Sequence, residues 1–188
     1  MNFKRYDKMS EKNPDIMINL REGNISLILD SYDDIFSDFD PRDYSVKALS
    51  DDFLNECKRA ARDKKDKLEL RFFVPMKKRN PIEEIMIKRR LKEHFQRHYR
   101  EKKKDLKNIR IGGLLWFILG TLIMIGSVYI YAIRESSFFY TFLFIVSEPA
   151  SWFFFWEGLE KIFITAKKEL PDYRFYGKMS KADFYFLD

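Results

Sequence analysis

The chain contains a single cysteine, Cys57, among its 188 residues. One cysteine excludes an intramolecular disulfide and fits a reducing compartment. The segment from Met1 to Asn13 lacks the apolar core of a secretory leader, so we expect no cleavable signal peptide. The first apolar segment of the chain is therefore expected to act as the membrane-targeting element.

The sequence also lacks the short motifs that carry common catalytic chemistry. It has no Walker-type or dinucleotide-binding glycine loop, no nucleophile elbow and no H-E-x-x-H helix. We therefore predict a non-enzymatic protein with no cofactor and no metal centre. His94 and His98 have zinc-compatible spacing, but no second ligand pair accompanies them, so we interpret them as part of a wet helix face.

Charge is missing from Ile111 to Ile133, a run of 23 residues that would be apolar on every face of a helix. A helix of this length is about 34 Å long, enough to cross a hydrocarbon core of roughly 30 Å. A second apolar run, 138–156, follows a link of four residues, and so short a link predicts an antiparallel helical hairpin. Aromatic residues near the expected interfaces are typical of membrane spans: Trp116, Tyr129, Tyr131, Tyr140, Trp152 and Trp156.

Basic residues flank the two apolar runs, whereas the link between the runs holds only Arg134. Positive charge stays on the cytoplasmic side of a membrane, so both termini are predicted to be cytoplasmic. The basic residues next to the first span are predicted to contact anionic lipid headgroups; they are Lys102, Lys103, Lys104, Lys107 and Arg110. No nucleic acid is expected, because no groove-reading module accompanies the charge.

The charged N-terminal part predicts a polar tail, 1–14, followed by a small α+β domain over 15–80. The predicted elements are a β-hairpin of 15–20 and 25–30 around Gly23, a helix from Asp51 to about Asp63 capped by Ser50, and a strand over 68–74 that Pro75 ends.

A long helix is predicted to begin at Pro81, because proline suits the first helical position. It would form a basic stalk over 81–110 and continue unbroken into the first span. The second helix is expected to extend to about residue 168 and to end at Pro171. In the C-terminal segment 171–188, a strand over 181–187 would then join the N-terminal sheet, since both termini lie on one side.

The predicted fold is therefore a small cytoplasmic α+β domain fused to a two-helix transmembrane hairpin. A long basic stalk helix leads into the first span, and a C-terminal strand returns to the N-terminal sheet.

Glu148 is the one acidic residue inside the second apolar run, and Pro149 follows it. Counted from Phe138, Glu148 lies about 15 Å along the helix, near the bilayer midplane. Central Asp, Lys or Arg costs roughly 2.5–3.5 kcal/mol on insertion scales, so Glu148 is expected to face protein or water. Its candidate hydrogen-bond partners are Thr121, Ser147 and Ser151. A kink is predicted at Pro149.

Three interpretations of Glu148 stay open. It lines an ion or proton pathway in an oligomer, it is a protonated carboxyl that fastens the hairpin or a subunit contact, or the second span is shallower and leaves it near water.

Small residues recur every seven positions in the first span, at Gly113, Gly120 and Ser127. Ser147 and Ser151 form a small-xxx-small pair in the second span. Small residues let membrane helices approach closely, either within the hairpin or between subunits. We expect a homo-oligomer, because two helices alone bury little surface.

An acidic stretch runs from Asp30 to Asp43, and its candidate contact residues are Asp33, Asp34, Asp38 and Asp40. It lacks the glycine and the terminal glutamate of an EF-hand loop. We interpret it as a solvated loop that docks on the basic stalk, with a protein partner or a cation as alternatives.

Two functions of different classes follow from this sequence. The first is a membrane-anchored adaptor or sensor that acts on a cytoplasmic protein partner through its α+β domain. The alternative is a small ion or proton channel, or a membrane-perturbing effector, with Glu148 in the pathway. Thr121 and Ser127 supply only part of a polar stripe, which favours the adaptor.

Overall fold

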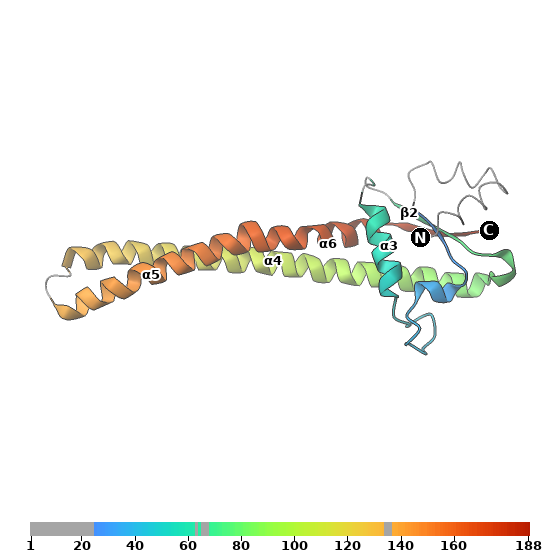
Figure 1. The fold of residues 1–188 in the computed structure, drawn as a ribbon, viewed down its shortest axis with the longest axis horizontal. Coiled ribbons are helices and arrows are strands. Elements are labelled where there is room, and N and C mark those ends of the chain that lie inside the picture. The colour runs from blue at the N-terminus through green and yellow to red at the C-terminus, as the bar shows by residue number, and fades with distance from the viewer. Residues whose placement is uncertain (1–24, 63, 65–67, 134–136) are drawn as a thin grey trace. The chain divides into compact units, whose positions relative to one another are not determined.

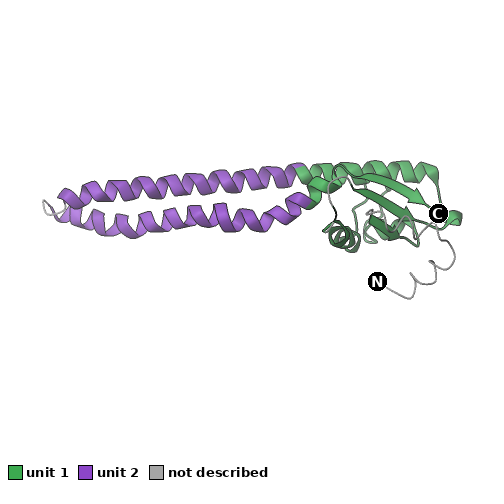
Figure 2. Cartoon of the chain, turned by 90° about the horizontal axis from the view of Figure 1, so that it is seen from above, with its two compact units in different colours: residues 1–99, 175–188 green, residues 100–174 purple. Residues whose placement is uncertain are grey.

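The computed structural model describes residues 25–62, 64, 68–133 and 137–188. The chain divides into two compact units, one of residues 1–99 and 175–188 and the other of residues 100–174 (Figure 2). The described residues are mostly helical, with one small sheet and two long apolar helices, which is compatible with the predicted small domain plus helical hairpin (Figure 1).

The first unit contains all three of the strands that the structure describes. Its elements are β1 (Ile25–Ile28), the 3-10 turn η1 (Tyr32–Ile35), α3 (Asp51–Ala61), β2 (Glu69–Phe73), the 3-10 turn η2 (Met76–Lys78), the start of α4 (Pro81–Ile133), the end of α6 (Ala166–Met179) and β3 (Asp183–Leu187).

The three strands form a parallel sheet in the order β1-β2-β3, with Ile25 opposite Leu70 and Glu69 opposite Asp183. Helix α3 connects β1 to β2, and the connection from β2 to β3 carries every residue of the second unit. Because β2 pairs on both sides and is largely buried, its apolar residues suit a parallel sheet. The strand predicted over 25–30 therefore ends at Ile28 and pairs with β2, while its predicted hairpin partner 15–20 lies outside the described residues.

The predicted C-terminal strand is present as β3, and it lies beside β2. Phe184 and Phe186 are buried, whereas Asp183 and Tyr185 are exposed, so the strand presents one apolar face to the core.

The core of the first unit consists of large side chains from the sheet and from α4. The ring centroids of Phe72 and Phe186 lie 5.1 Å apart, and those of Phe95 and Phe184 lie 6.1 Å apart. Ile87, Leu91 and Phe95 are completely buried. The first five turns of α4 thus pack on the sheet, where the sequence had placed the start of a separate stalk.

Pro171 does not end the last helix as predicted, and the helix does not stop near residue 168. Pro171 lies inside α6, which continues to Met179. A helical proline removes one backbone donor. Beyond it, Phe175 and Met179 are buried in the first unit, and their burial offsets that loss.

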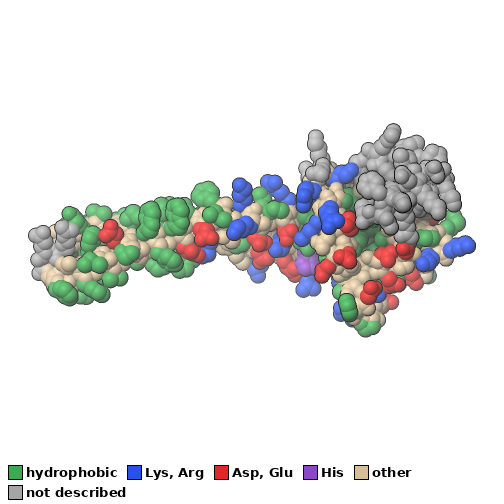
Figure 3. Space-filling model, in the orientation of Figure 1, with side chains coloured by type: hydrophobic (Ala, Val, Ile, Leu, Met, Phe, Trp, Pro, Cys, Tyr) green, Lys and Arg blue, Asp and Glu red, His purple; other side chains and the backbone are tan. Residues whose placement is uncertain are grey.

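The second unit consists of the apolar part of α4, then α5 (Phe138–Glu160), a π-helical turn η4 (Lys161–Thr165) and the start of α6. Helix α4 runs without a break, as predicted, and Pro149 lies inside α5. Two helical stretches, Pro81–Ile133 and Phe138–Met179, are long and apolar enough to cross a membrane. Hydrophobic side chains cover much of the visible face of α5, whereas charged side chains gather elsewhere on the chain (Figure 3). Most of the link, 134–136, lies outside the described residues.

Candidate functional site

In the second unit, glycines lie at the contact between α4 and the helical segment formed by α5 and η4. We call this contact the seam. A Cβ atom added at Gly120 would lie 2.3 Å from the backbone nitrogen of Phe155, and one at Gly158 would lie 2.4 Å from that of Phe117. One at Gly113 would lie 2.9 Å from η4 side chains. No side chain fits at such distances, so glycine allows the two backbones to touch.

The seam runs in antiparallel register along both helices. Gly120 lies beside Phe155, and Ser127 Oγ donates a hydrogen bond to Ser147 Oγ at 2.8 Å. The predicted small residues of the first span therefore face the partner helix of the same hairpin. Sequence reasoning missed Gly158, although it follows Ser151 by seven residues and so continues the small-residue spacing.

The three hydroxyl groups that were predicted to hydrogen-bond to Glu148 donate to backbone carbonyls instead. Thr121 Oγ1 donates to the carbonyl of Phe117 at 2.8 Å, and Ser147 Oγ donates to a carbonyl one turn earlier at 3.0 Å. Ser151 Oγ donates to the main-chain carbonyl of Glu148 at 2.7 Å, and not to its carboxyl.

The side chain of Glu148 is exposed on the hairpin, on a face rich in apolar residues. It lines an open groove of about 740 Å³, together with Met124, Ser127, Val128, Tyr131, Phe144, Pro149, Ser151 and Trp152. No hydrogen bond or ion pair joins its carboxyl to any residue that the structure describes.

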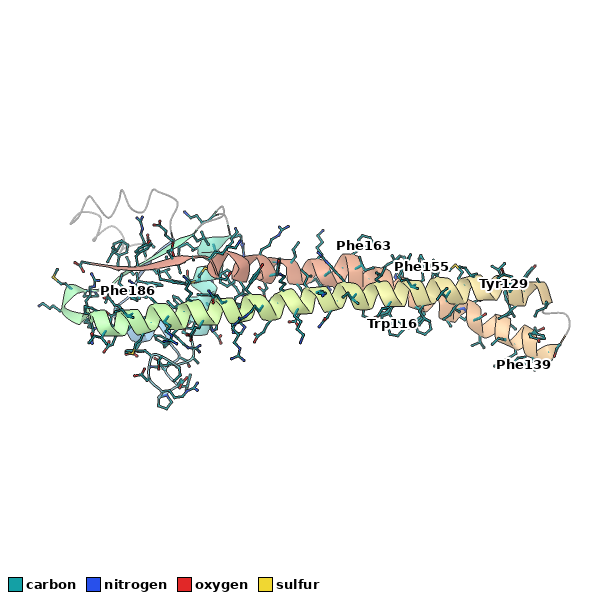
Figure 4. All side chains as sticks on the ribbon, turned by 180° about the vertical axis from the view of Figure 1, so that it is seen from behind. Trp116, Tyr129, Phe139, Phe155, Phe163 and Phe186 are labelled. Carbon is teal, nitrogen blue, oxygen red and sulfur yellow. The ribbon has the colours of Figure 1, made fainter. Side chains whose placement is uncertain are left out.

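Charged and aromatic side chains meet at the other end of the seam. Lys161 Nζ lies 5.3 Å from the ring centroid of Trp116 and pairs with Glu157. Lys161 also lies beside Gly113. The apolar layer that the two helices share is therefore shorter than the segment that begins at Ile111. Trp116 and Phe155 are marked in Figure 4, along with Tyr129, Phe139 and Phe163, whose side chains are exposed.

The basic residues before the first span divide into two groups. Lys103, Lys104, Lys107 and Arg110 are exposed. Lys102 is half-buried, and its Nζ donates to Glu169 Oε2 at 2.9 Å. This hydrogen bond raises the pKa of Lys102. Four of the five predicted headgroup contacts are thus accessible, whereas the fifth is engaged within the unit.

Carboxylates of the acidic stretch bond to groups of their own loop. Asp40 accepts from the Arg42 guanidinium and from the Ala48 amide at 2.7 Å, and these contacts hold its pKa well below the usual range. Asp33 accepts from Lys47 Nζ and from Tyr44 Oη, both at 3.1 Å. Burial and the neighbouring Asp33 raise the pKa of Tyr44 to about 12.

The other two acidic candidates differ from each other. Asp34 accepts hydrogen bonds from the backbone amides of Asp30 and Ser31 at the start of η1, while Asp38 is exposed. Among the described residues no group of three or more His, Cys, Asp or Glu side chains could hold a metal ion. The loop reaches α4 through Arg90 Nε, which donates to the carbonyl of Lys47 at 3.0 Å.

A buried ionic cluster that the sequence did not reveal joins η1 to the start of α4. Glu84 is only 6% exposed and accepts from Tyr32 Oη and Arg79 Nε, each at 2.9 Å. Burial acts to raise the pKa of Glu84, but the Arg79 and Tyr32 hydrogen bonds hold it below the usual range. Arg79 also pairs with Asp188. Arg79 and Glu84 are 5 positions apart, but Tyr32 lies 52 positions from Glu84 and Asp188 lies 109 positions from Arg79, so local patterns carry no signal for the whole cluster.

A groove in the first unit runs between α4 and β3. The groove is lined by Lys88, Arg89, Lys92, Glu93 and Gln96 from the helix and by Ala182, Asp183, Phe184 and Tyr185 from the strand region. Strand β3 stands at one end of the strand order, and no described strand pairs with its outer edge. Arg89 pairs with Glu93, while Lys88 Nζ lies 5.5 Å from the ring centroid of Phe186.

No protein-family model, curated protein or solved structure matches this chain.

Proposed function

We propose that this chain is a non-enzymatic, membrane-anchored adaptor or sensor, with a two-pass hairpin in the bilayer and both flanks on the cytoplasmic side. The observation that carries the proposal is the pairing of β2 with β3. These strands precede and follow the hairpin, so a hairpin that crosses a membrane must have both flanks on the same side. The basic flanks assign that side to the cytoplasm.

Anionic headgroups are the lipid partner in this proposal. Lys103, Lys104, Lys107 and Arg110 are exposed beside the apolar part of α4. Each basic residue near an anionic surface contributes about 1 kcal/mol of attraction. Phosphatidylserine in the membrane would therefore strengthen the binding of this basic segment to the lipid surface.

The groove between α4 and β3 is the docking surface that we assign to the adaptor. A strand edge without a neighbour offers backbone hydrogen-bonding groups to an extended peptide, which then adds as a further strand. Lys88 and Lys92 outnumber Asp183 in the lining of the groove, and Arg89 and Glu93 neutralise each other. The surface therefore fits an extended segment with acidic side chains. The exposed Asp38 and Phe39 form a separate contact surface at the acidic loop.

Site-specific photocrosslinking tests this docking surface. With p-benzoylphenylalanine at position 185 in the full chain, we expect one crosslinked partner in cells, and we expect Lys88→Glu with Lys92→Glu to abolish that adduct. The matched control is Lys77→Glu with Lys78→Glu, which changes the same charge at exposed positions outside the groove. Equal crosslinking in both double variants would contradict the assignment.

A channel or membrane-perturbing effector is the second candidate, and the carboxyl of Glu148 in an apolar groove favours it. Ion flux in proteoliposomes separates the two functions. The adaptor proposal predicts no flux above that of empty liposomes. Flux that Glu148→Gln abolishes would instead establish the channel.

A further inference from the structure

The strongest unexplained feature of the hairpin is the position of Glu148. It lies eleven residues from Ser137, about 16 Å along the helix, and thirteen residues from Lys161, about 20 Å in the other direction. Within the proposed membrane insertion, on which this inference rests, the carboxyl is therefore deep in the apolar layer. A polar group at that depth is costly unless it faces protein or water.

The hairpin itself does not provide the missing partner. Glu148 is exposed and makes no hydrogen bond or ion pair within the part of the chain that the structure describes. The hydroxyls nearest in the sequence, Ser147 and Ser151, donate to backbone carbonyls. Ser127 Oγ, on the groove wall, lies within hydrogen-bond distance of Ser147 Oγ and of the Ile123 carbonyl, so its single hydroxyl proton is also engaged within the hairpin.

A second copy of the chain can provide that partner. Copies inserted with the same topology place each residue at the same depth, and a two-fold axis along the membrane normal preserves that depth. Glu148 is the only charged residue in the two apolar segments of the sequence, Ile111 to Ile133 and Phe138 to Trp156. The charged side chain that a second copy brings to the depth of Glu148 is therefore the same carboxyl.

We propose that a second copy packs into the groove around Glu148 and that the two Glu148 carboxyls hydrogen-bond to each other across a two-fold axis. In the neutral acid form each carboxyl donates one hydrogen bond and accepts one. Met124, Val128 and Trp152 on the groove walls then pack against the same residues of the neighbour. The seam of Gly113, Gly120 and Gly158 is already filled within each hairpin, so this face is a separate surface.

Disulfide crosslinking in proteoliposomes tests the face. In a Cys57→Ala background, Val128→Cys lies on the groove, whereas Val146→Cys lies at a similar depth and is exposed but does not line the groove. We expect a crosslinked dimer from the first variant and none from the second. Equal crosslinking at both positions, or crosslinking only at position 146, would overturn the proposed face.

Energy transfer between labelled copies, measured over a range of protein-to-lipid ratios, tests the carboxyl pair. Hydrogen bonds between membrane helices predict that Glu148→Ala weakens dimerisation roughly three- to thirtyfold. Glu148→Gln retains a donor and an acceptor and should stay near the wild-type value. An unchanged dimer in Glu148→Ala would overturn the pair, and a stoichiometry above two would overturn the two-fold arrangement in favour of a ring.

Alkaline extraction of the same liposomes separates this inference from the proposed function. Protein that resists extraction but shows no crosslink overturns the dimer alone. Protein that alkali removes overturns the membrane anchor and the dimer together.

Discussion

Each of the two units is stabilised internally by a different kind of residue, large side chains in the first and glycines in the second. The first unit buries large side chains, with Phe72, Phe95 and Ile87 almost inaccessible to solvent. The second unit joins its helices through Gly120 and Gly158 and carries its large side chains on the outside. In water, burial of apolar surface drives packing, whereas in lipid the tails are as apolar as leucine, so close backbone contact must replace it. The difference fits the proposal that the first unit packs in water and the second in lipid.

The largest expected effect is a cavity in the first unit. Phe72→Ala should cost about 3–5 kcal/mol in the free energy of unfolding, because Phe72 is completely buried against Phe186 and Phe184. Urea unfolding of the full chain in detergent, followed by proteolysis of the first unit, measures the loss. Phe39→Ala is the matched control, since Phe39 is 98% exposed and should lose nothing. Similar losses in both variants would refute the assigned core.

A single methyl group should weaken the second unit. Gly120→Ala is expected to cost about 1–3 kcal/mol, because its Cβ would overlap the backbone of Phe155. Gly126→Ala adds the same methyl group where nothing lies within 4 Å of it. Energy transfer between labels on the two helices of one hairpin measures their separation. If Gly126→Ala opens the hairpin as much as Gly120→Ala, the glycine seam is wrong.

Acid should destabilise the first unit through Glu84. Its pKa in the folded protein lies below the ordinary value of 4.5, so it stabilises the fold above that pH. This contribution is lost as the pH falls through the lower folded pKa. Glu84→Gln should cost roughly 1–3 kcal/mol at neutral pH, because Arg79 then loses a charged partner. Between pH 7 and pH 3, the midpoint temperature of thermal unfolding should fall less steeply in this variant than in the wild type. Parallel curves would exclude the role assigned to Glu84.

The smallest effect is expected at the serine pair of the seam. Ser127→Ala removes its 2.8 Å hydrogen bond to Ser147 but keeps a small side chain. Hydrogen bonds between membrane helices average about 0.6 kcal/mol. Hairpin separation should therefore change much less than in Gly120→Ala, and a larger change would mean that hydroxyls rather than glycines hold the seam.

Sequence reasoning succeeded where a signal was local. Ser50 and Pro81 mark helix starts, the apolar run from Ile111 identifies one long helix, and small residues recur every seven positions. Each of these signals depends on neighbours within one or two turns.

It failed where distant residues decide the outcome. The parallel pairing of β1 with β2 brings together residues on either side of α3, such as Ile25 and Leu70. Helix α6 continues past Pro171 because Phe175 and Met179 reach a buried core. The cluster of Glu84, Arg79 and Asp188 brings together residues more than 100 positions apart. None of these contacts can be inferred from spacing alone.

The most direct test of the account is the accessibility of three single cysteines to a membrane-impermeant thiol reagent. The full chain with Cys57→Ala is inserted into sealed vesicles, and Lys103→Cys, Ser137→Cys and Lys181→Cys are labelled separately. We expect positions 103 and 181, before and after the hairpin, to react from the same side, and position 137, at the start of α5, to react only from the other side. Labelling of positions 103 and 181 from opposite sides would contradict both the membrane hairpin and the pairing of β2 with β3.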